Sequence, residues 1–248
     1  MGYTFNALPG DSFVMGRNPF WPMLERTPEP ALRFGRLEFR GKRPELEALI
    51  GECLMAWPQV DAELGLFFGQ LLAMPSASMV AVFQTLRRSS NQRDAIATAA
   101  DITLKDSADD RLLVYSLLDV HKSIEAERNA IAHGHYGICD LHPDILVWMN
   151  TETYIDYHMM FLTGAWIKAT REKEGNEFAR RLFYYRNSDL ERLLKDIDYL
   201  SKMWVDAINW LRSPMDIPGP FARETKYRQL CDQPRIAEAL QIRRQKNS

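Results

Sequence analysis

The sequence has few cysteines, and they form no recognisable framework. Cys53, Cys139 and Cys231 are far apart and odd in number, and no two of them make a C-x-x-C pair. Disulfide scaffolds and thiolate zinc sites need paired or closely spaced cysteines, so both classes are excluded. Free thiols are typical of a reducing, intracellular compartment. We therefore expect a cytoplasmic protein.

The chain also lacks long apolar runs and an excess of either charge. No run is long enough to span a bilayer, and Pro9, Gly10 and Asp11 stand where a signal peptide needs its apolar stretch. The 31 Lys and Arg residues against 33 Asp and Glu residues give a formal net charge of −2. A protein that coats nucleic acid through bulk charge is strongly basic. We expect no membrane partner, and any contact with RNA must be local.

Helical periodicity dominates the middle of the chain. Hydrophobic residues make up 46% of the 248 residues, which is enough to build a sizeable core. Apolar residues recur at helical spacing from 44 to 134 and again from 188 to 213. The pattern predicts a long helix that begins at Pro44 and is kinked at Pro58. A second helix starts at Pro75-Ser76, and a short third helix follows it. The fourth helix begins at Asp106 or Ser107 and ends at Gly134. A capping box from Ser188 to Glu191 opens the last long helix.

A change of period between these helical regions indicates β structure. Segments 145–149 and 154–161 are rich in β-branched and aromatic residues, and 180–186 adds a third such segment. We expect a mainly α fold, a helical bundle with a small antiparallel β appendage. Residues 1–43 form a proline-rich extended arm, 44–213 the helical domain with its β insertion around 145–186, and 214–248 a polar C-terminal tail.

One short segment combines residues with chemical potential. It reads Glu127-Arg128-Asn129-Ala130-Ile131-Ala132-His133-Gly134 and ends the fourth predicted helix. An arginine stays charged and matches phosphate geometry with two parallel hydrogen bonds. A histidine titrates near neutral pH and can act as general base or general acid. Together they suit the cleavage of RNA, whose 2′-hydroxyl is its own nucleophile.

The run Arg128-Asn129-x-x-x-His133 followed by glycine resembles the R-x(4–6)-H motif of the HEPN superfamily. The order of helices from about 44 to 213 is similar to that superfamily too. The resemblance implies a metal-independent endoribonuclease that needs no cofactor and whose active site forms at a homodimer interface. It also implies a setting such as toxin–antitoxin or antiviral defence, with an antitoxin or a nucleotidyltransferase as partner. Other members have lost activity and serve as RNA-binding or protein-binding modules, which is the alternative here.

Each residue of the motif receives a role. We expect His133 to be the acid/base, Arg128 the phosphate clamp, and Asn129 a group that orients the imidazole or a phosphate oxygen. Asn129 and His133 are four residues apart and share a helix face, whereas Arg128 and His133 are five apart and diverge. A second protomer would bring the diverging groups together, which favours a composite dimer site. Alternatively, Arg128 pairs with Glu125 on a surface, and His133 only caps its helix.

Further residues beside the motif are candidates for contact with RNA. His135 is expected to lie in a loop or to make a secondary contact with phosphate. Tyr136 stands three residues after His133, whereas some HEPN toxins carry a tyrosine that a partner nucleotidyltransferase can modify two residues after theirs. Alternatively, Tyr136 is a core residue or lies at a strand edge. His121 lies on a helical stripe with Glu125 and Arg128 that would either extend a polar groove or form a solvated face. No Gly-rich phosphate loop, paired metal carboxylates or Ser/His/Asp arrangement stands out, so we expect no metal and no cofactor.

Overall fold

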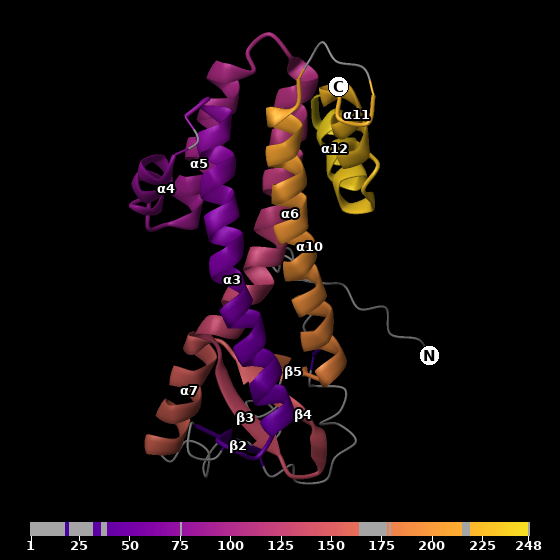
Figure 1. The fold of residues 1–248 in the computed structure, drawn as a ribbon. Helices are drawn as coiled ribbons and strands as arrows, with labels where there is room; N and C mark the ends of the chain where they lie inside the picture. Colours follow the sequence, from indigo (N-terminus) through magenta and orange to yellow (C-terminus); the bar gives the residue numbers. More distant parts are fainter. Residues whose placement is uncertain are drawn as a thin grey trace. The chain divides into compact units, whose positions relative to one another are not determined.

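The computed structural model describes residues 18–19, 32–35, 39–74, 76–163, 178, 180–214 and 219–247. Within these residues the fold is mainly α with one small antiparallel sheet, as the sequence predicts (Figure 1). The helices are α3 (Pro44–Leu71), α4 (Ala77–Gln84), α5 (Ser89–Thr103), α6 (Ala108–His133), α7 (Thr151–Leu162), α10 (Asn187–Arg212), α11 (Arg223–Cys231) and α12 (Pro234–Asn247). The strands are β1 (Asn18–Pro19), β2 (Leu32–Phe34), β3 (His135–Cys139), β4 (His142–Met149) and β5 (Phe183–Tyr185).

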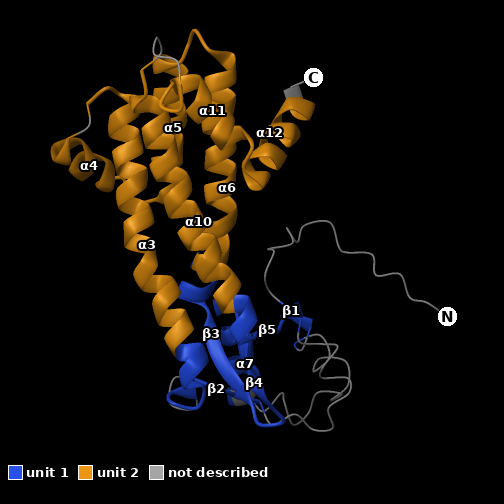
Figure 2. Cartoon of the chain, turned by 45° about the vertical axis from the view of Figure 1, so that its right-hand side comes forward, with its two compact units in different colours: residues 1–47, 129–189 blue, residues 48–128, 190–248 orange. Residues whose placement is uncertain are grey.

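The chain divides into two compact units (Figure 2). The sheet unit comprises residues 1–47 and 129–189, and the helical unit comprises residues 48–128 and 190–248. The boundary falls inside α3, α6 and α10, so the chain passes between the units within continuous helices. Each unit is described separately below.

The sheet unit is built on a hairpin that follows directly from α6. Its strands lie in the order β1-β5-β4-β3-β2, and every neighbouring pair is antiparallel. Alternate residues of β4 face one side of the sheet. On that side they form a core with neighbouring apolar residues, namely Cys139, Ile145, Val147, Met149, Phe178 and Leu182. The predicted strands at 145–149 and 180–186 are therefore confirmed in β4 and β5.

The segment predicted as the strand 154–161 is instead the helix α7. It lies beside the β3–β4 hairpin in Figure 1, and Tyr154 and Tyr157 pack against the sheet core. Asn150 Oδ1 accepts a hydrogen bond from the backbone N–H of Thr153 at 2.8 Å and so caps the helix start. The aromatic composition suggested a strand, but the apolar sheet face needs a cover that spans several strands, and an amphipathic helix supplies it.

Short pieces of the predicted N-terminal arm complete the sheet. β1 pairs with β5 and β2 pairs with β3, each at an edge of the sheet. These two segments of the predicted extended arm are thus edge strands of the sheet, and most of the arm lies outside the described residues. The arm also contacts the start of α10, because Asn18 Nδ2 donates to Asp189 Oδ2 at 2.8 Å.

The helical unit contains most of α3, α6 and α10, which run side by side in Figures 1 and 2. Their apolar residues at helical spacing meet in a core whose largest members are Phe67, Phe83, Trp204 and Trp210. The rings of Phe67 and Trp204 lie 5.0 Å apart between centroids. Pro58 lies within α3, so that helix continues past it as predicted. No helix in the described part of the chain is both long and apolar enough to cross a membrane.

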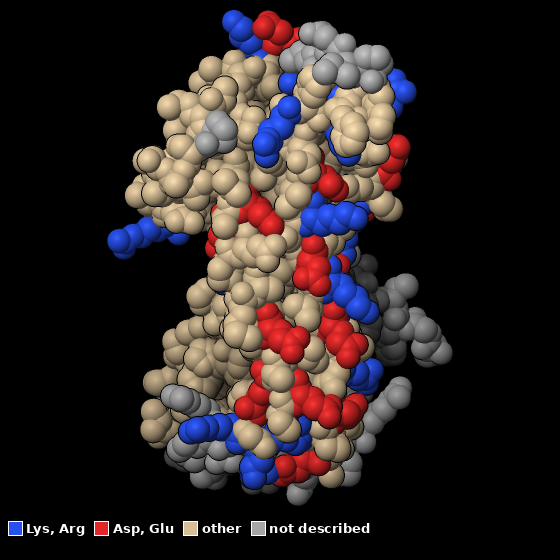
Figure 3. Space-filling view, in the orientation of Figure 1, with Lys and Arg blue, Asp and Glu red and all other residues tan. Residues whose placement is uncertain are grey.

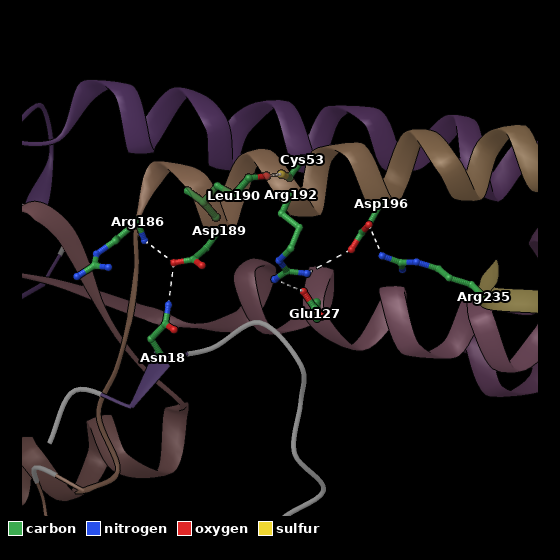
Figure 4. Close-up of polar contacts among 9 residues, drawn as sticks. All are labelled: Asn18, Cys53, Glu127, Arg186, Asp189, Leu190, Arg192, Asp196 and Arg235. Atoms are coloured by element: carbon green, nitrogen blue, oxygen red, sulfur yellow. Dashed lines mark hydrogen bonds and ion pairs between the residues drawn. The ribbon is translucent and has the colours of Figure 1, made fainter. Parts of the chain in front are cut away.

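The helix boundaries depend on local hydrogen bonds that the sequence only partly predicts. Ser76 caps α4 by accepting from the Met79 N–H at 3.2 Å, and Ser107 caps α6 by accepting from the Asp110 N–H at 3.2 Å, as predicted. The predicted capping box of α10 is displaced. The helix begins at Asn187, and the carboxylate of Asp189 accepts the N–H of Arg186 at 2.9 Å, as Figure 4 shows.

The segment that we described as a polar tail forms α11 and α12. Few of its residues are apolar, but Leu230, Ile236 and Leu240 are buried. Ion pairs add to this packing: Arg223 binds Asp110 at 2.8 Å, Arg243 binds Asp119 at 2.5 Å, and Arg235 binds Asp196. The tail is therefore part of the helical unit.

Candidate functional site

The Arg128–Gly134 motif occupies the last turns of α6. That helix starts at the Ser107 cap, carries Asp109 and Asp110 in its first turn, and ends at His133, immediately before Gly134. The boundary between the two units falls within α6, after Arg128 of the helical unit and before Asn129 of the sheet unit. The surroundings of the arginine and of the histidine therefore belong to different units.

The guanidinium of Arg128 is held against an aromatic ring. It lies 5.1 Å from the centroid of the Trp57 ring, and the residue is half-buried. Burial raises the pKa of the nearby Asp61 carboxyl, and the charge of Arg128 and the side chain of Trp57 oppose this rise. The alternative partner Glu125 forms an ion pair with Arg93. Arg128 is thus a positioned cation rather than a freely moving surface side chain.

A polar network holds the turn of α6 just before Arg128. Arg192 donates to Glu127 Oε2 at 3.1 Å and to Asp196 Oδ2 at 3.2 Å, and Arg235 binds the other oxygen of Asp196 (Figure 4). Burial raises the pKa of Glu127, and the positive charge of Arg192 opposes this rise. The network ties α6, α10 and α12 together in the helical unit, so the backbone that carries Arg128 is fixed.

Aromatic side chains of the sheet unit complete the end of α6. The last carbonyls of a helix have no partner within it. Here Trp148 Nε1–H donates to the Ala130 carbonyl at 2.9 Å, and the Tyr136 hydroxyl donates to the Ile131 carbonyl at 2.5 Å. His133 itself is exposed at the end of the helix. Two carbonyls of the last turn are thus satisfied by other side chains, which leaves the imidazole accessible to a ligand.

The glycine of the motif has a structural reason. A Cβ atom on Gly134 would lie 1.6 Å from Nε1 of Trp148, closer than any real contact. Gly134 therefore lets the indole reach the helix end, and its presence after His133 reflects packing rather than chemistry. Trp148 was not among the residues that the sequence singled out. Its position on a strand two residues before a helix cap gave no sign of this contact.

Tyr136 has a structural role, as the alternative interpretation of this residue expected. Besides its hydrogen bond to Ile131, its ring stacks on Phe39 with centroids 5.6 Å apart. These contacts explain the residue without RNA, and its predicted contact with substrate stays a prediction.

His135 begins β3 on the opposite face of the sheet from Tyr136. Its ring stacks on Tyr154 of α7, with centroids 3.9 Å apart and planes within 5°, and its Nε2 lies 3.3 Å from Thr151 Oγ1. Burial and the neighbouring His158 lower the pKa of His135 below the usual histidine range. The ring is thus placed in contact with aromatic side chains, and the predicted contact of His135 with phosphate stays a prediction.

His121 lies in the core of the helical unit, 1% exposed. Its Nδ1 accepts a hydrogen bond from Trp204 Nε1–H at 3.1 Å, and its ring contacts Trp57. Burial lowers the pKa of His121 to about 3. The stripe with Glu125, itself 6% exposed, is neither a groove nor a solvated face. The prediction that His121 contacts substrate is therefore wrong, because packed helices cover it.

The geometry of α6 separates the motif residues as the sequence indicated. At 100° per residue, Arg128 and His133 point about 140° apart, whereas Asn129 and His133 point about 40° apart. Asn129 is half-buried. One helix thus presents Asn129 with His133 and directs Arg128 elsewhere.

Charge on the visible surface is mixed. On the face shown in Figure 3, the Lys and Arg side chains of the described residues lie among Asp and Glu side chains and form no continuous basic surface. This distribution agrees with the near-zero net charge and with a local contact for any RNA. Within the described part of the chain, no group of three or more His, Cys, Asp or Glu residues is placed to hold a metal ion.

Comparisons of this chain with protein-family models, with curated proteins and with solved structures found no match. The class that the structure itself defines is a mainly α protein with a small antiparallel sheet and an Arg-Asn-x-x-x-His motif at the end of a long helix.

Proposed function

We propose that this protein is a metal-independent endoribonuclease of the HEPN type. The observation that carries the proposal is the end of α6, where His133 is exposed while Trp148 and Tyr136 satisfy the adjoining carbonyls. Two of the last four carbonyls of the helix are thus bonded without His133, and an exposed histidine is a residue type that can transfer protons.

The roles follow from the chemistry of RNA. His133 removes the proton of a 2′-hydroxyl, whose oxygen attacks the neighbouring phosphorus. The protonated His133 then gives a proton to the 5′-oxygen as the bond between that oxygen and phosphorus breaks. The products carry a 2′,3′-cyclic phosphate and a 5′-hydroxyl. Arg128 neutralises the charge that develops on the phosphate, and the planar guanidinium held on Trp57 is suited to this.

A homodimer is part of the proposal. Arg128 and His133 diverge by about 140° on one helix, so they reach one phosphate most readily from two copies related by a two-fold axis. Each composite site then takes its arginine from one copy and its histidine from the other. An antitoxin or nucleotidyltransferase partner rests on the HEPN resemblance alone.

One observation favours a second function, an inactive HEPN-like module that binds RNA or a protein. Arg128 is half-buried against Trp57 and close to Asp61, and this environment accounts for a positive charge at this position without catalysis. The two functions differ in one result, since only the enzyme changes the length of an RNA that it binds.

Cleavage by purified variants tests the proposal. His133→Ala should lower the cleavage rate by roughly 10²- to 10⁴-fold because it removes the acid/base. Arg128→Lys should also fail, since an ammonium keeps the charge but loses the planar fork. The matched control is His142→Ala, a histidine of the sheet unit at the other end of the β3–β4 hairpin from His133. Equal rates for wild type and His133→Ala would sink the proposal.

A further inference from the structure

A row of aromatic rings lies in the sheet unit next to the end of α6. His135 stacks on Tyr154 at 3.9 Å, and His158 meets Tyr154 edge-on at 4.4 Å and Tyr157 at 5.6 Å between centroids. We call His135, Tyr154, Tyr157 and His158 the aromatic cluster. One ring comes from β3 and three come from α7, so the cluster exists only because residues 151–162 are helical.

The aromatic cluster lies close to His133, the proposed acid/base, because His135 is near His133 in the sequence. His135 follows His133 by two residues, which limits the distance between their Cα atoms to about 7 Å. Three of the rings are half-buried and His158 is exposed, so the cluster reaches the surface. Rings fixed in position at a surface offer stacking area at little entropic cost.

The charged residues of α7 indicate which part of a nucleic acid the aromatic cluster binds. The helix carries Glu152 and Asp156 and has no Lys or Arg. Asp156 is bound by Arg181 at 2.6 Å, and burial and the neighbouring His158 lower the pKa of His135, which disfavours a positive charge on its ring. A phosphate would meet no cation from α7, whereas a nucleic acid base needs only an aromatic face.

We propose that the aromatic cluster is a base-binding subsite, which stacks an unpaired base of RNA next to the phosphate that His133 acts on. The inference rests on the proposed function for the identity of the ligand. It goes beyond that function in assigning substrate selection to Tyr154 and His158. Because a base must be unstacked to enter, the subsite selects single-stranded or looped RNA over duplex.

The test measures binding apart from cleavage. The probe is a fluorescein-labelled single-stranded 12-mer of random sequence with 2′-O-methyl groups throughout, which has no free nucleophile, and affinity is read by fluorescence anisotropy. Tyr154→Ala and His158→Ala should each weaken binding by roughly 5- to 100-fold, the range for loss of one stacked base. Tyr154→Phe keeps the ring and should bind like wild type.

Two controls separate stacking from other effects. Ile155→Ala truncates a neighbouring side chain of α7 that is 55% exposed and outside the cluster, and it should leave affinity unchanged. An abasic 12-mer of the same backbone should bind wild type and Tyr154→Ala equally. Unchanged affinity in both Tyr154→Ala and His158→Ala, with circular dichroism showing intact folds, would overturn the subsite.

Failure of the subsite and failure of the proposed function give different results. If wild type cuts RNA and the Tyr154→Ala and His158→Ala variants bind the uncleavable 12-mer normally, the subsite is wrong and the nuclease stands. If wild type binds the 12-mer through Tyr154 but cuts no RNA, the nuclease is wrong and the base-binding subsite stands.

Discussion

At the scale of single residues, the motif is shaped by partners that are distant in sequence. The Trp148 indole leaves no room for a Cβ at position 134, which explains the glycine there. Trp57 covers the guanidinium of Arg128, and Trp204 donates a hydrogen bond to the buried His121. The spacing of Arg128 and His133 was visible in the sequence because helix geometry is regular. Which ring covers which polar group was not visible, since those contacts depend on how separate elements pack.

Gly134→Ala should destabilise the protein. The added Cβ would fall 1.6 Å from Trp148 Nε1, so the indole must move and lose its hydrogen bond to Ala130. Overpacking of this kind costs about 1–3 kcal/mol of unfolding free energy, measurable by urea denaturation. Gly51→Ala is the control, because nothing lies within 4 Å of its added Cβ. That change in a helix should be neutral or stabilising. Equal stability of the two variants would contradict the packing account.

His121 should make stability depend on pH. Its folded pKa of about 3 lies below the unfolded value of 6.5, so the unfolded chain binds the extra proton. The contribution of the neutral ring is complete above pH 6.5 and is lost as the pH falls toward 3. At pH 5 the loss amounts to about 2 kcal/mol.

The measurement is the free energy of unfolding of wild type and His121→Phe between pH 7 and pH 4.5. Carboxylates titrate in both proteins, so the difference between the two curves isolates the histidine. The wild-type curve should fall more steeply as the pH is lowered. Parallel curves would show that His121 is not buried in its neutral form.

At the scale of elements, the sequence predicted the long helices well because repeated apolar residues report a buried face directly. It missed α7, where aromatic residues suited either a strand or a helix that covers a sheet. It also missed α11 and α12, which are mostly polar. Their stability depends on ion pairs to Asp110, Asp119 and Asp196, and such pairs leave no periodic pattern in the sequence.

Asp196→Ala should weaken the attachment of α12 to α10. The Asp196 side chain is 12% exposed and binds both Arg192 and Arg235, so its loss leaves two cations without that partner. We expect a loss of about 1–3 kcal/mol of unfolding free energy. Glu224→Ala is the matched control, because its pair with Arg228 is 66% and 73% exposed and should contribute less than about 1 kcal/mol. Thermal denaturation of both variants measures the two losses of unfolding free energy. A larger loss in Glu224→Ala than in Asp196→Ala would contradict the role assigned to Asp196.

At the scale of the whole molecule, the divergence of Arg128 and His133 predicts that the active protein is a dimer with shared sites. Arg128→Ala and His133→Ala should each be inactive alone. When the two are refolded together in equal amounts, half the dimers are mixed and one of their two sites is intact, so about a quarter of wild-type activity should return. No recovery, in a sample that light scattering shows to be dimeric, would mean that each site lies within one chain.

The central claim, that this chain cuts RNA with His133 and without a metal, is tested most directly by the ends of its products. A labelled single-stranded RNA is incubated with wild type in EDTA, beside His133→Ala purified in parallel, and the ends are identified by mass spectrometry. The account predicts cleavage in wild type only, with 2′,3′-cyclic phosphate ends, and no cleavage of a fully 2′-deoxy strand. Cleavage that disappears in EDTA, that persists in His133→Ala, or that also cuts the 2′-deoxy strand would contradict it.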